Sequence, residues 1–201
     1  MKFPIANVLT FTRIAMIPLV VVFFYLPSSW ASPAAAIAFI IAAITDSLDG
    51  YFARKYGQTT ALGAFLDPVA DKLMVATALI LLASHDVTKL RLIRFDPSII
   101  VSVTAAVIVG REITISALRE WMAELGARKK VAVSSLGKVK TGFQMTGLSM
   151  MLFRENLWGL PIYELGLYCL IVAAILTLWS MVVYLQAAWP ELKGKTQKVG
   201  T

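Results

Sequence analysis

The stretch that decides the fold is TDSLDGYFARKYGQTTALGAFLDPVADK, residues 45–72. It contains the aspartates Asp46, Asp49, Asp67 and Asp71, and long apolar runs precede the first pair and follow the second. A charged side chain at the centre of a membrane helix costs about 2.5–3.5 kcal/mol on insertion scales. Clustered acids in such a setting have to be neutralised, and this requirement is the first indication of function.

The rest of the chain has the composition of a membrane protein. Of its 201 residues, 58% are hydrophobic and 15% are charged, whereas an average soluble domain is about 45–50% apolar. A helix needs about 20 mostly apolar residues to cross the hydrocarbon core. Six transmembrane helices are predicted, at residues 8–26, 31–54, 64–83, 97–118, 134–153 and 163–188. We therefore predict an all-α integral membrane protein with a short N-terminal interfacial segment, a single domain over residues 1–190 and a polar tail over residues 191–201.

The basic residues predict how the helices are oriented. The net charge is +7, but the basic residues cluster just outside apolar segments, which suits anionic lipid headgroups rather than nucleic acid. Under the positive-inside rule, both termini lie in the cytoplasm. The connector between the second and third helices then lies there too, with the four aspartates beside it. Fewer basic residues fall on the opposite side, namely Lys89, Arg91, Arg94 and Arg154.

Helical spacing places the aspartates on two stripes. At about 100° per residue, steps of three, four and seven return close to the same helix face. A short turn between the second and third helices makes them antiparallel neighbours, so that the stripes can face each other. The first stripe consists of Asp46, Asp49, Gly50 and Ala53, and the second of Gly63, Asp67 and Asp71.

Carboxylates that face each other across a gap offer hard oxygen ligands to divalent cations. We predict Mg²⁺ or Mn²⁺, with enough acids for two ions. Gly50, Ala53 and Gly63 leave room for a bulky ligand, although small residues also bring helices together. Arg54 lies beside the first stripe, and a guanidinium near metal ions favours a phosphate-bearing ligand, although Arg54 also fits a positive-inside anchor. Together these residues predict a diphosphate site.

The same spacing resembles the signature of the CDP-alcohol phosphotransferase family. The shared run is Asp46-x2-Asp49-Gly50-x2-Ala53-Arg54-x8-Gly63-x3-Asp67-x3-Asp71. Three more segments resemble the branch whose bacterial members make phosphatidylglycerol phosphate: NVLTFTRIAMIPL from Asn7, GREITISALREWMAELG from Gly110 and SSLGKVKTGFQ from Ser134. The resemblance covers the chain up to about Trp189.

This resemblance implies transfer of the phosphatidyl group from CDP-diacylglycerol to sn-glycerol 3-phosphate, with release of CMP. It implies that the four aspartates bind metal and that Asp71 also takes the proton from the attacking hydroxyl. It also implies a homodimer in the bacterial inner membrane, among membrane lipids, with its active site facing the cytoplasm. The residues expected at CDP-diacylglycerol are Gly50, Ala53, Arg54, Gly63, Asn7 and Thr10, where Asn7, Thr10 and Arg13 either line the nucleotide end or hold the first helix against it.

An anionic acceptor needs its own cations. Arg111 follows an almost uncharged stretch and would be costly in lipid without a partner, and Arg119 lies about two turns further on. Lys138 and Lys140 open the fifth predicted helix on the same side of the membrane. We expect these four residues to bind glycerol phosphate, with Glu112 orienting Arg111. A basic side chain that extends to the membrane surface is the alternative for each of them.

Other functions stay open at this point. Within the family, serine, inositol phosphate or phosphatidylglycerol could replace glycerol 3-phosphate as the acceptor. A metal-dependent prenyltransferase also pairs aspartate-rich helices with a diphosphate, but with a different spacing of its carboxylates. A divalent-cation transporter would use intramembrane aspartates without needing the basic residues, and the six segments show no inverted repeat. Release of CMP separates the first group from the other two.

Overall fold

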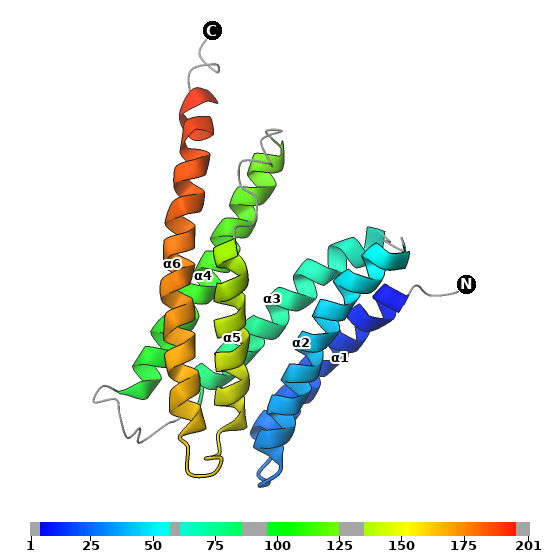
Figure 1. Ribbon diagram of the computed structural model, residues 1–201, viewed down its shortest axis with the longest axis vertical. Helices are drawn as coiled ribbons and strands as arrows, with labels where there is room; N and C mark the ends of the chain where they lie inside the picture. Colours follow the sequence, from blue (N-terminus) through cyan, green and yellow to red (C-terminus); the bar gives the residue numbers. More distant parts are fainter. Residues whose placement is uncertain (1–4, 57–60, 86–95, 125–134, 196–201) are drawn as a thin grey trace.

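The computed structural model describes residues 5–56, 61–85, 96–124 and 135–195, and within them it contains six α-helices and no β-strand (Figure 1). The helices are α1 (Ile5–Tyr25), α2 (Ala31–Tyr56), α3 (Ala61–Ala83), α4 (Pro97–Glu124), α5 (Ser135–Phe153) and α6 (Ile162–Lys195). Each falls on one of the six predicted segments, so the all-α prediction is confirmed. Residues 1–4, where the predicted interfacial segment begins, lie outside the described part.

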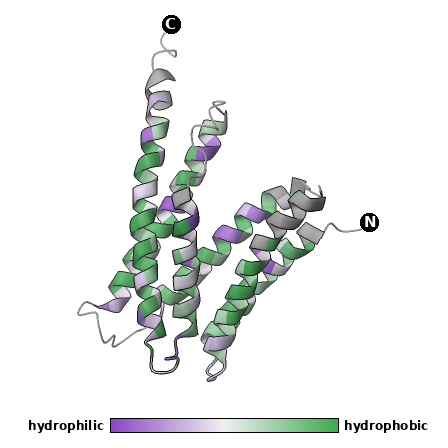
Figure 2. Cartoon of the chain, viewed as in Figure 1, coloured by the Kyte–Doolittle hydropathy of each residue, from purple (hydrophilic) through white to green (hydrophobic). Residues whose placement is uncertain are grey.

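Three helices are long and apolar enough to cross a membrane. The spans are Val8–Tyr25 in α1, Pro97–Glu124 in α4 and Ile162–Pro190 in α6, and a shorter apolar stretch runs over Ala31–Asp46. Figure 2 shows hydrophobic residues over most of the length of these helices. Large apolar side chains are also exposed on the outside, and soluble monomers rarely gather so many. These exposed positions include Phe65 and Ile80 on α3 and Trp179 on α6.

The helices form two groups, which meet through α3 and through the packing of α2 against α5. In the first group α1 packs along α2 and also covers α3, and in the second α6 packs against α5 and α4. α3 crosses obliquely from the first group to contact α4 and α5, and α1 begins and α6 ends at the same end of the molecule (Figure 1). The sequence predicted α2 and α3 as close neighbours, but they contact each other only sparingly. Along their described lengths, α1 packs against both helices and α3 runs obliquely away from α2 (Figure 1).

α5 and α6 approach each other closely at two glycines. A Cβ atom added to Gly147 would lie 2.8 Å from the carbonyl oxygen of Gly166 and 3.0 Å from the amide nitrogen of Leu170. Because real Cβ atoms do not approach backbone so closely, both glycines are needed for this contact. The contact fixes the position of α5, which also carries Lys140 about two turns before Gly147.

The helix ends follow local sequence signals. Asp96 precedes α4, and its carboxylate accepts hydrogen bonds from the backbone amide of Ser98 at 2.9 Å and from its hydroxyl at 2.6 Å. These bonds lower the pKa of the Asp96 carboxyl below its ordinary value of 3.8. With Pro97 in the first helical position, this is a typical start of a helix.

Candidate functional site

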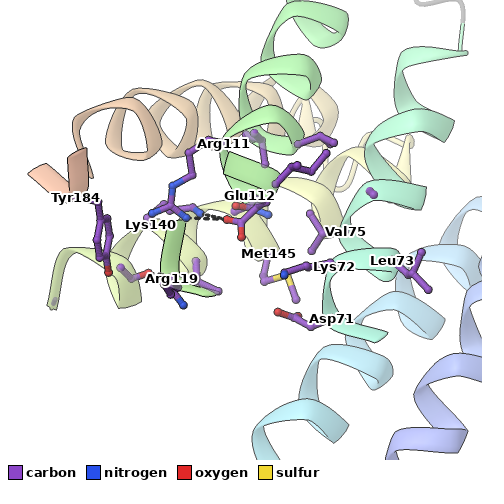
Figure 3. A pocket seen from close by; sticks show the side chains of 17 residues that line it. Asp71, Lys72, Leu73, Val75, Arg111, Glu112, Arg119, Lys140, Met145 and Tyr184 are labelled. Atoms are coloured by element: carbon purple, nitrogen blue, oxygen red, sulfur yellow. Dashed lines mark hydrogen bonds and ion pairs between the residues drawn. The ribbon is translucent and has the colours of Figure 1, made fainter. Parts of the chain in front are cut away.

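A cavity of about 360 Å³ lies where α3, α4, α5 and α6 meet (Figure 3). Its apolar walls include Val75, Ile108 and Met145. The charged side chains that line it consist of four cations and two carboxylates, so that the cavity favours an anion. These residues are Lys72, Arg111, Arg119 and Lys140, with Asp71 and Glu112.

Arg111 is the centre of the basic group. It is only 6% exposed, and its Nη1 lies 3.0 Å from Oε1 of Glu112 while its Nη2 donates to Oγ of Ser180 at 2.8 Å. Lys140 Nζ from α5 reaches the same Glu112 oxygen at 2.5 Å. One carboxylate therefore holds two cations in place and neutralises only one of them. Nε of Arg111 is buried and has no hydrogen-bond partner among the described residues.

The structure brings together three of the four basic residues that the sequence predicted for the acceptor. Arg111, Arg119 and Lys140 line the cavity, and Glu112 pairs with Arg111 as expected. Lys138 is exposed and is not among the lining residues. It is two residues from Lys140, and about 200° of rotation points it to another side of α5.

Asp71 lies between the two charged parts of the molecule. It lines the cavity on the α3 side, away from the arginines and lysine of α4 and α5 (Figure 3). The charges of Asp46 and Arg13 act on it from one side, and those of Glu112 and Lys140 act on it from the other. Its carboxylate makes no hydrogen bond or ion pair with a described residue, so its oxygens are available to a ligand.

Two other acids are held by α1. Arg13 is fully buried, and its Nη1 lies 2.8 Å from Oδ1 of Asp46, which is 43% exposed. Thr10 Oγ1 donates to Oδ1 of Asp67 at 2.6 Å. The sequence left open whether these α1 residues line the nucleotide end or hold the helix in place. Thr10 and Arg13 do hold α1 against the acidic helices.

For several predicted residues, the structure describes the helix but not the side chain. They are Asn7 on α1, and Asp49, Gly50, Ala53 and Arg54 on α2. Gly63 is described, and it is buried on α3 one turn before Asp67. Among the described side chains, no three carboxylates, imidazoles or thiols gather closely enough to hold a metal ion. The donor chemistry still fits a divalent cation, because the charges of Asp46 and Asp71 act on each other, Asp46 is partly exposed, and Asp71 makes no hydrogen bond or ion pair with a described residue.

Sequence reasoning missed four residues at this site. Lys72 lines the cavity beside Asp71, and its Nζ donates to Oγ of Ser116 on α4. Gln144 and Tyr184 also line the cavity, and Ser180 binds Arg111. Their only signal in the sequence is a polar group within a largely apolar segment.

Comparison with known proteins gives matches over nearly the whole chain. A family model described as CDP-alcohol phosphatidyltransferase matches residues 3–185. Three similar proteins carry the name CDP-diacylglycerol–glycerol-3-phosphate 3-phosphatidyltransferase. They come from Salmonella choleraesuis strain SC-B67 (50% identical), Escherichia coli strain K12 (49%) and Shigella flexneri serotype 5b strain 8401 (49%). Each match spans 192 residues, which is 96% of this chain and 98% of the relative. The resemblance found in the sequence is confirmed.

Proposed function

The chain belongs to the CDP-alcohol phosphatidyltransferase family, and on this premise we propose that it transfers the phosphatidyl group of CDP-diacylglycerol to glycerol 3-phosphate. The products are phosphatidylglycerol phosphate and CMP. Relatives that are about half identical over 96% of the chain carry the name of this activity. The observation that carries the proposal is the cavity in which Asp71 lies opposite Arg111, Arg119 and Lys140.

The acceptor binds on the α4 and α5 side of this cavity. A phosphate monoester carries a charge of about −1.5 to −2 near neutral pH, and the four lining cations outnumber the two carboxylates. The free Nε of Arg111 and the exposed guanidinium of Arg119 supply donors suited to phosphate oxygens. The volume of about 360 Å³ lies within the range of small-molecule sites. Lys138 has no part in this role, because it is exposed and does not line the cavity.

The donor binds on the α2 and α3 side. Asp46, Asp49, Asp67 and Asp71 would hold one or two divalent ions, Mg²⁺ or Mn²⁺. Bound ions of this kind neutralise the diphosphate and the charge that develops on the leaving CMP. The other residues proposed for CDP-diacylglycerol are Gly50, Ala53, Arg54, Gly63, Asn7 and Thr10, and the hydrogen bond from Thr10 to Asp67 supports the inclusion of α1.

Asp71 takes the proton in the proposed reaction. With its phosphate on Arg111 and Arg119, the acceptor can turn its primary hydroxyl towards α3. The hydroxyl oxygen forms a bond to the phosphatidyl phosphorus, while the bond from that phosphorus to the bridging oxygen of CMP breaks. The hydroxyl proton passes to Asp71, whose carboxylate lacks a protein partner among the described residues. Holding both substrates in one cavity makes the attack effectively intramolecular.

We further propose six spans within one domain over residues 1–190, followed by the polar tail over residues 191–201, and both termini in the cytoplasm of a bacterium. The beginning of α1 and the end of α6 lie at the same end of the molecule, as six antiparallel spans require (Figure 1). The acidic and basic side chains lie towards this end, which supports a site on the cytoplasmic side of the inner membrane. The homodimer stays an expectation from the family, to be tested by the mass of the purified protein in detergent.

One assay tests the proposed activity. Purified protein receives CDP-diacylglycerol, Mg²⁺ or Mn²⁺, and one of four acceptors: glycerol 3-phosphate, serine, inositol phosphate or phosphatidylglycerol. We expect CMP and phosphatidylglycerol phosphate with glycerol 3-phosphate alone, and loss of turnover when a chelator removes the metal. CMP release with a different acceptor would identify another branch of the family. No CMP with any metal and acceptor would refute the enzyme, and metal uptake into vesicles would then favour a transporter.

A further inference from the structure

The C-terminal half of α6 contacts both arginines of the cavity. Ser180 and Tyr184 are four residues apart and therefore lie on one face of the helix. Ser180 Oγ accepts a hydrogen bond from Nη2 of Arg111 at 2.8 Å. The ring of Tyr184 has the guanidinium carbon of Arg111 at 5.8 Å from its centroid and that of Arg119 at 5.6 Å. Both distances are within the range of cation–π interactions.

The Tyr184 ring is itself held firmly. It is 7% exposed and belongs to a small apolar cluster between α4 and α6, with Ile115, Met122 and Ala188. Ser180 is also buried, and its hydroxyl donates to the carbonyl oxygen of Thr177, which leaves its lone pairs for Arg111. α6 therefore presents a fixed surface to two long basic side chains.

Arg119 depends on the Tyr184 ring more than Arg111 does. It is exposed, and among the described residues its only hydrogen-bond, ion-pair or ring partner is Tyr184. Lys140 and Arg111 lie nearby and repel it when no anion is bound. An arginine loses much rotational freedom when it binds a ligand, and a ring that already holds the guanidinium reduces that loss.

We propose that Tyr184 and Ser180 are positioning residues, which hold Arg111 and Arg119 in the arrangement that binds the anionic acceptor. This inference rests on the proposed function, because the acceptor is taken to be glycerol 3-phosphate. Neither residue contacts the reacting atoms in this account. Their effect therefore belongs to the affinity for the acceptor and not to the chemical step or to the donor.

The test compares Tyr184→Leu with Tyr184→Phe and with Tyr168→Leu. The last variant makes the same change at an exposed position of α6 that does not line the cavity. For Tyr184→Leu we expect KM for glycerol 3-phosphate to rise about tenfold, which corresponds to about 1.4 kcal/mol, from the loss of two cation–π contacts. We expect kcat and KM for CDP-diacylglycerol to stay within about threefold. Tyr184→Phe keeps the ring and should raise the acceptor KM by about twofold or less, as should Tyr168→Leu.

A double variant separates positioning from a general loss of structure. If Tyr184 acts through Arg119, then adding Tyr184→Leu to Arg119→Ala should raise KM by about threefold rather than a further tenfold. An unchanged acceptor KM in Tyr184→Leu, equal rises for donor and acceptor, or fully multiplicative effects would each overturn the inference.

A direct measurement of binding distinguishes failure of the inference about Tyr184 from failure of the proposed function. Calorimetric titration with glycerol 3-phosphate needs no turnover. Weaker binding by Tyr184→Leu, in a protein that releases no CMP, would support the inference and refute the enzyme. Equal binding by wild type and Tyr184→Leu, in a protein that does release CMP, would refute the inference and leave the enzyme in place.

Discussion

The contact between α5 and α6 allows a sharp test of the packing beneath the cavity. In Gly147→Ala the new methyl carbon would meet the Gly166 carbonyl oxygen at 2.8 Å and the Leu170 amide at 3.0 Å. Both neighbours are backbone atoms of α6, so neither can rotate away as a side chain could. The helices have to separate, which changes the contact along its whole length.

The expected magnitude follows from two opposing effects. Overpacking of a well-packed interior costs about 1–3 kcal/mol, whereas alanine is favoured over glycine within a helix by about 1 kcal/mol. Gly142 lies on the same helix, and a Cβ atom there would have nothing within 4 Å. Gly142→Ala therefore keeps the second effect alone. We expect Gly147→Ala to be less stable than Gly142→Ala by about 1–3 kcal/mol.

The difference in stability is measured by unfolding both variants in mixed detergent micelles and monitoring the loss of helix by circular dichroism. Gly147→Ala should also raise KM for glycerol 3-phosphate, because the displaced α5 carries Lys140. Gly142→Ala, only two residues from Lys140, should leave that KM within about twofold, since its methyl group meets no other atom. Equal stability of the two variants would show that α5 and α6 do not approach each other closely at Gly147.

The remaining predictions concern charged residues. Asp71→Asn should lose turnover by about two to four orders of magnitude while retaining most of its affinity for CDP-diacylglycerol, and near-normal kcat would refute its role as base. Lys140→Ala should raise the acceptor KM about tenfold or more. The matched control, Lys138→Ala, should change this KM by about twofold or less. Similar effects of the two variants would contradict the finding that Lys140 lines the cavity and Lys138 does not. Hydrogen bonds from the Ser98 hydroxyl and amide lower the pKa of Asp96, so their stabilisation of α4 is complete above the ordinary pKa of 3.8 and is lost as the pH falls below it. Asp96→Ala should accordingly melt at a lower temperature than wild type at pH 6, and this gap should narrow towards pH 3; a gap that does not depend on pH would refute the hydrogen-bonded cap.

Much of the fold was predictable, because the positions of the helices depend on local sequence signals. Apolar length decides whether a segment is a helix that can enter lipid, and all six predicted segments are helices. Their breaks carry signals that act within a few residues, such as the aspartate and proline at the start of α4. The family signature also depends only on residue types at fixed spacings, and comparison with known proteins confirms the family.

The arrangement of the acids was less predictable, because it depends on which helix lies opposite. Asp67 and Asp71 are four residues apart, so the sequence places them on one face of α3. In the structure Asp67 accepts its hydrogen bond from α1, whereas Asp71 lines the cavity towards α4 and α5. Four residues rotate a helix by about 40° beyond a full turn, and α3 runs obliquely between two groups of helices. A helical wheel describes one helix and cannot say that two neighbours share its face.

The residues of α6 were harder still to foresee. Ser180 and Arg111 are 69 positions apart, and no spacing rule connects them. Tyr184 lies in an apolar stretch where an aromatic residue is ordinary packing. Only the crossing of α4 and α6 brings its ring to Arg111 and Arg119.

The separation of the charges explains why the proposed chemistry would need both groups of helices. The donor diphosphate and the acceptor phosphate repel each other. With a single shared set of cations, the two anions would compete for the same site and could not bind side by side. Here α1 braces Asp46 and Asp67 on one side, and α6 braces Arg111 and Arg119 on the other. Asp71 lies between these sides and is influenced by charges from both. In the proposed reaction, the two anions therefore meet beside α3, where the carboxylate that receives the proton is located.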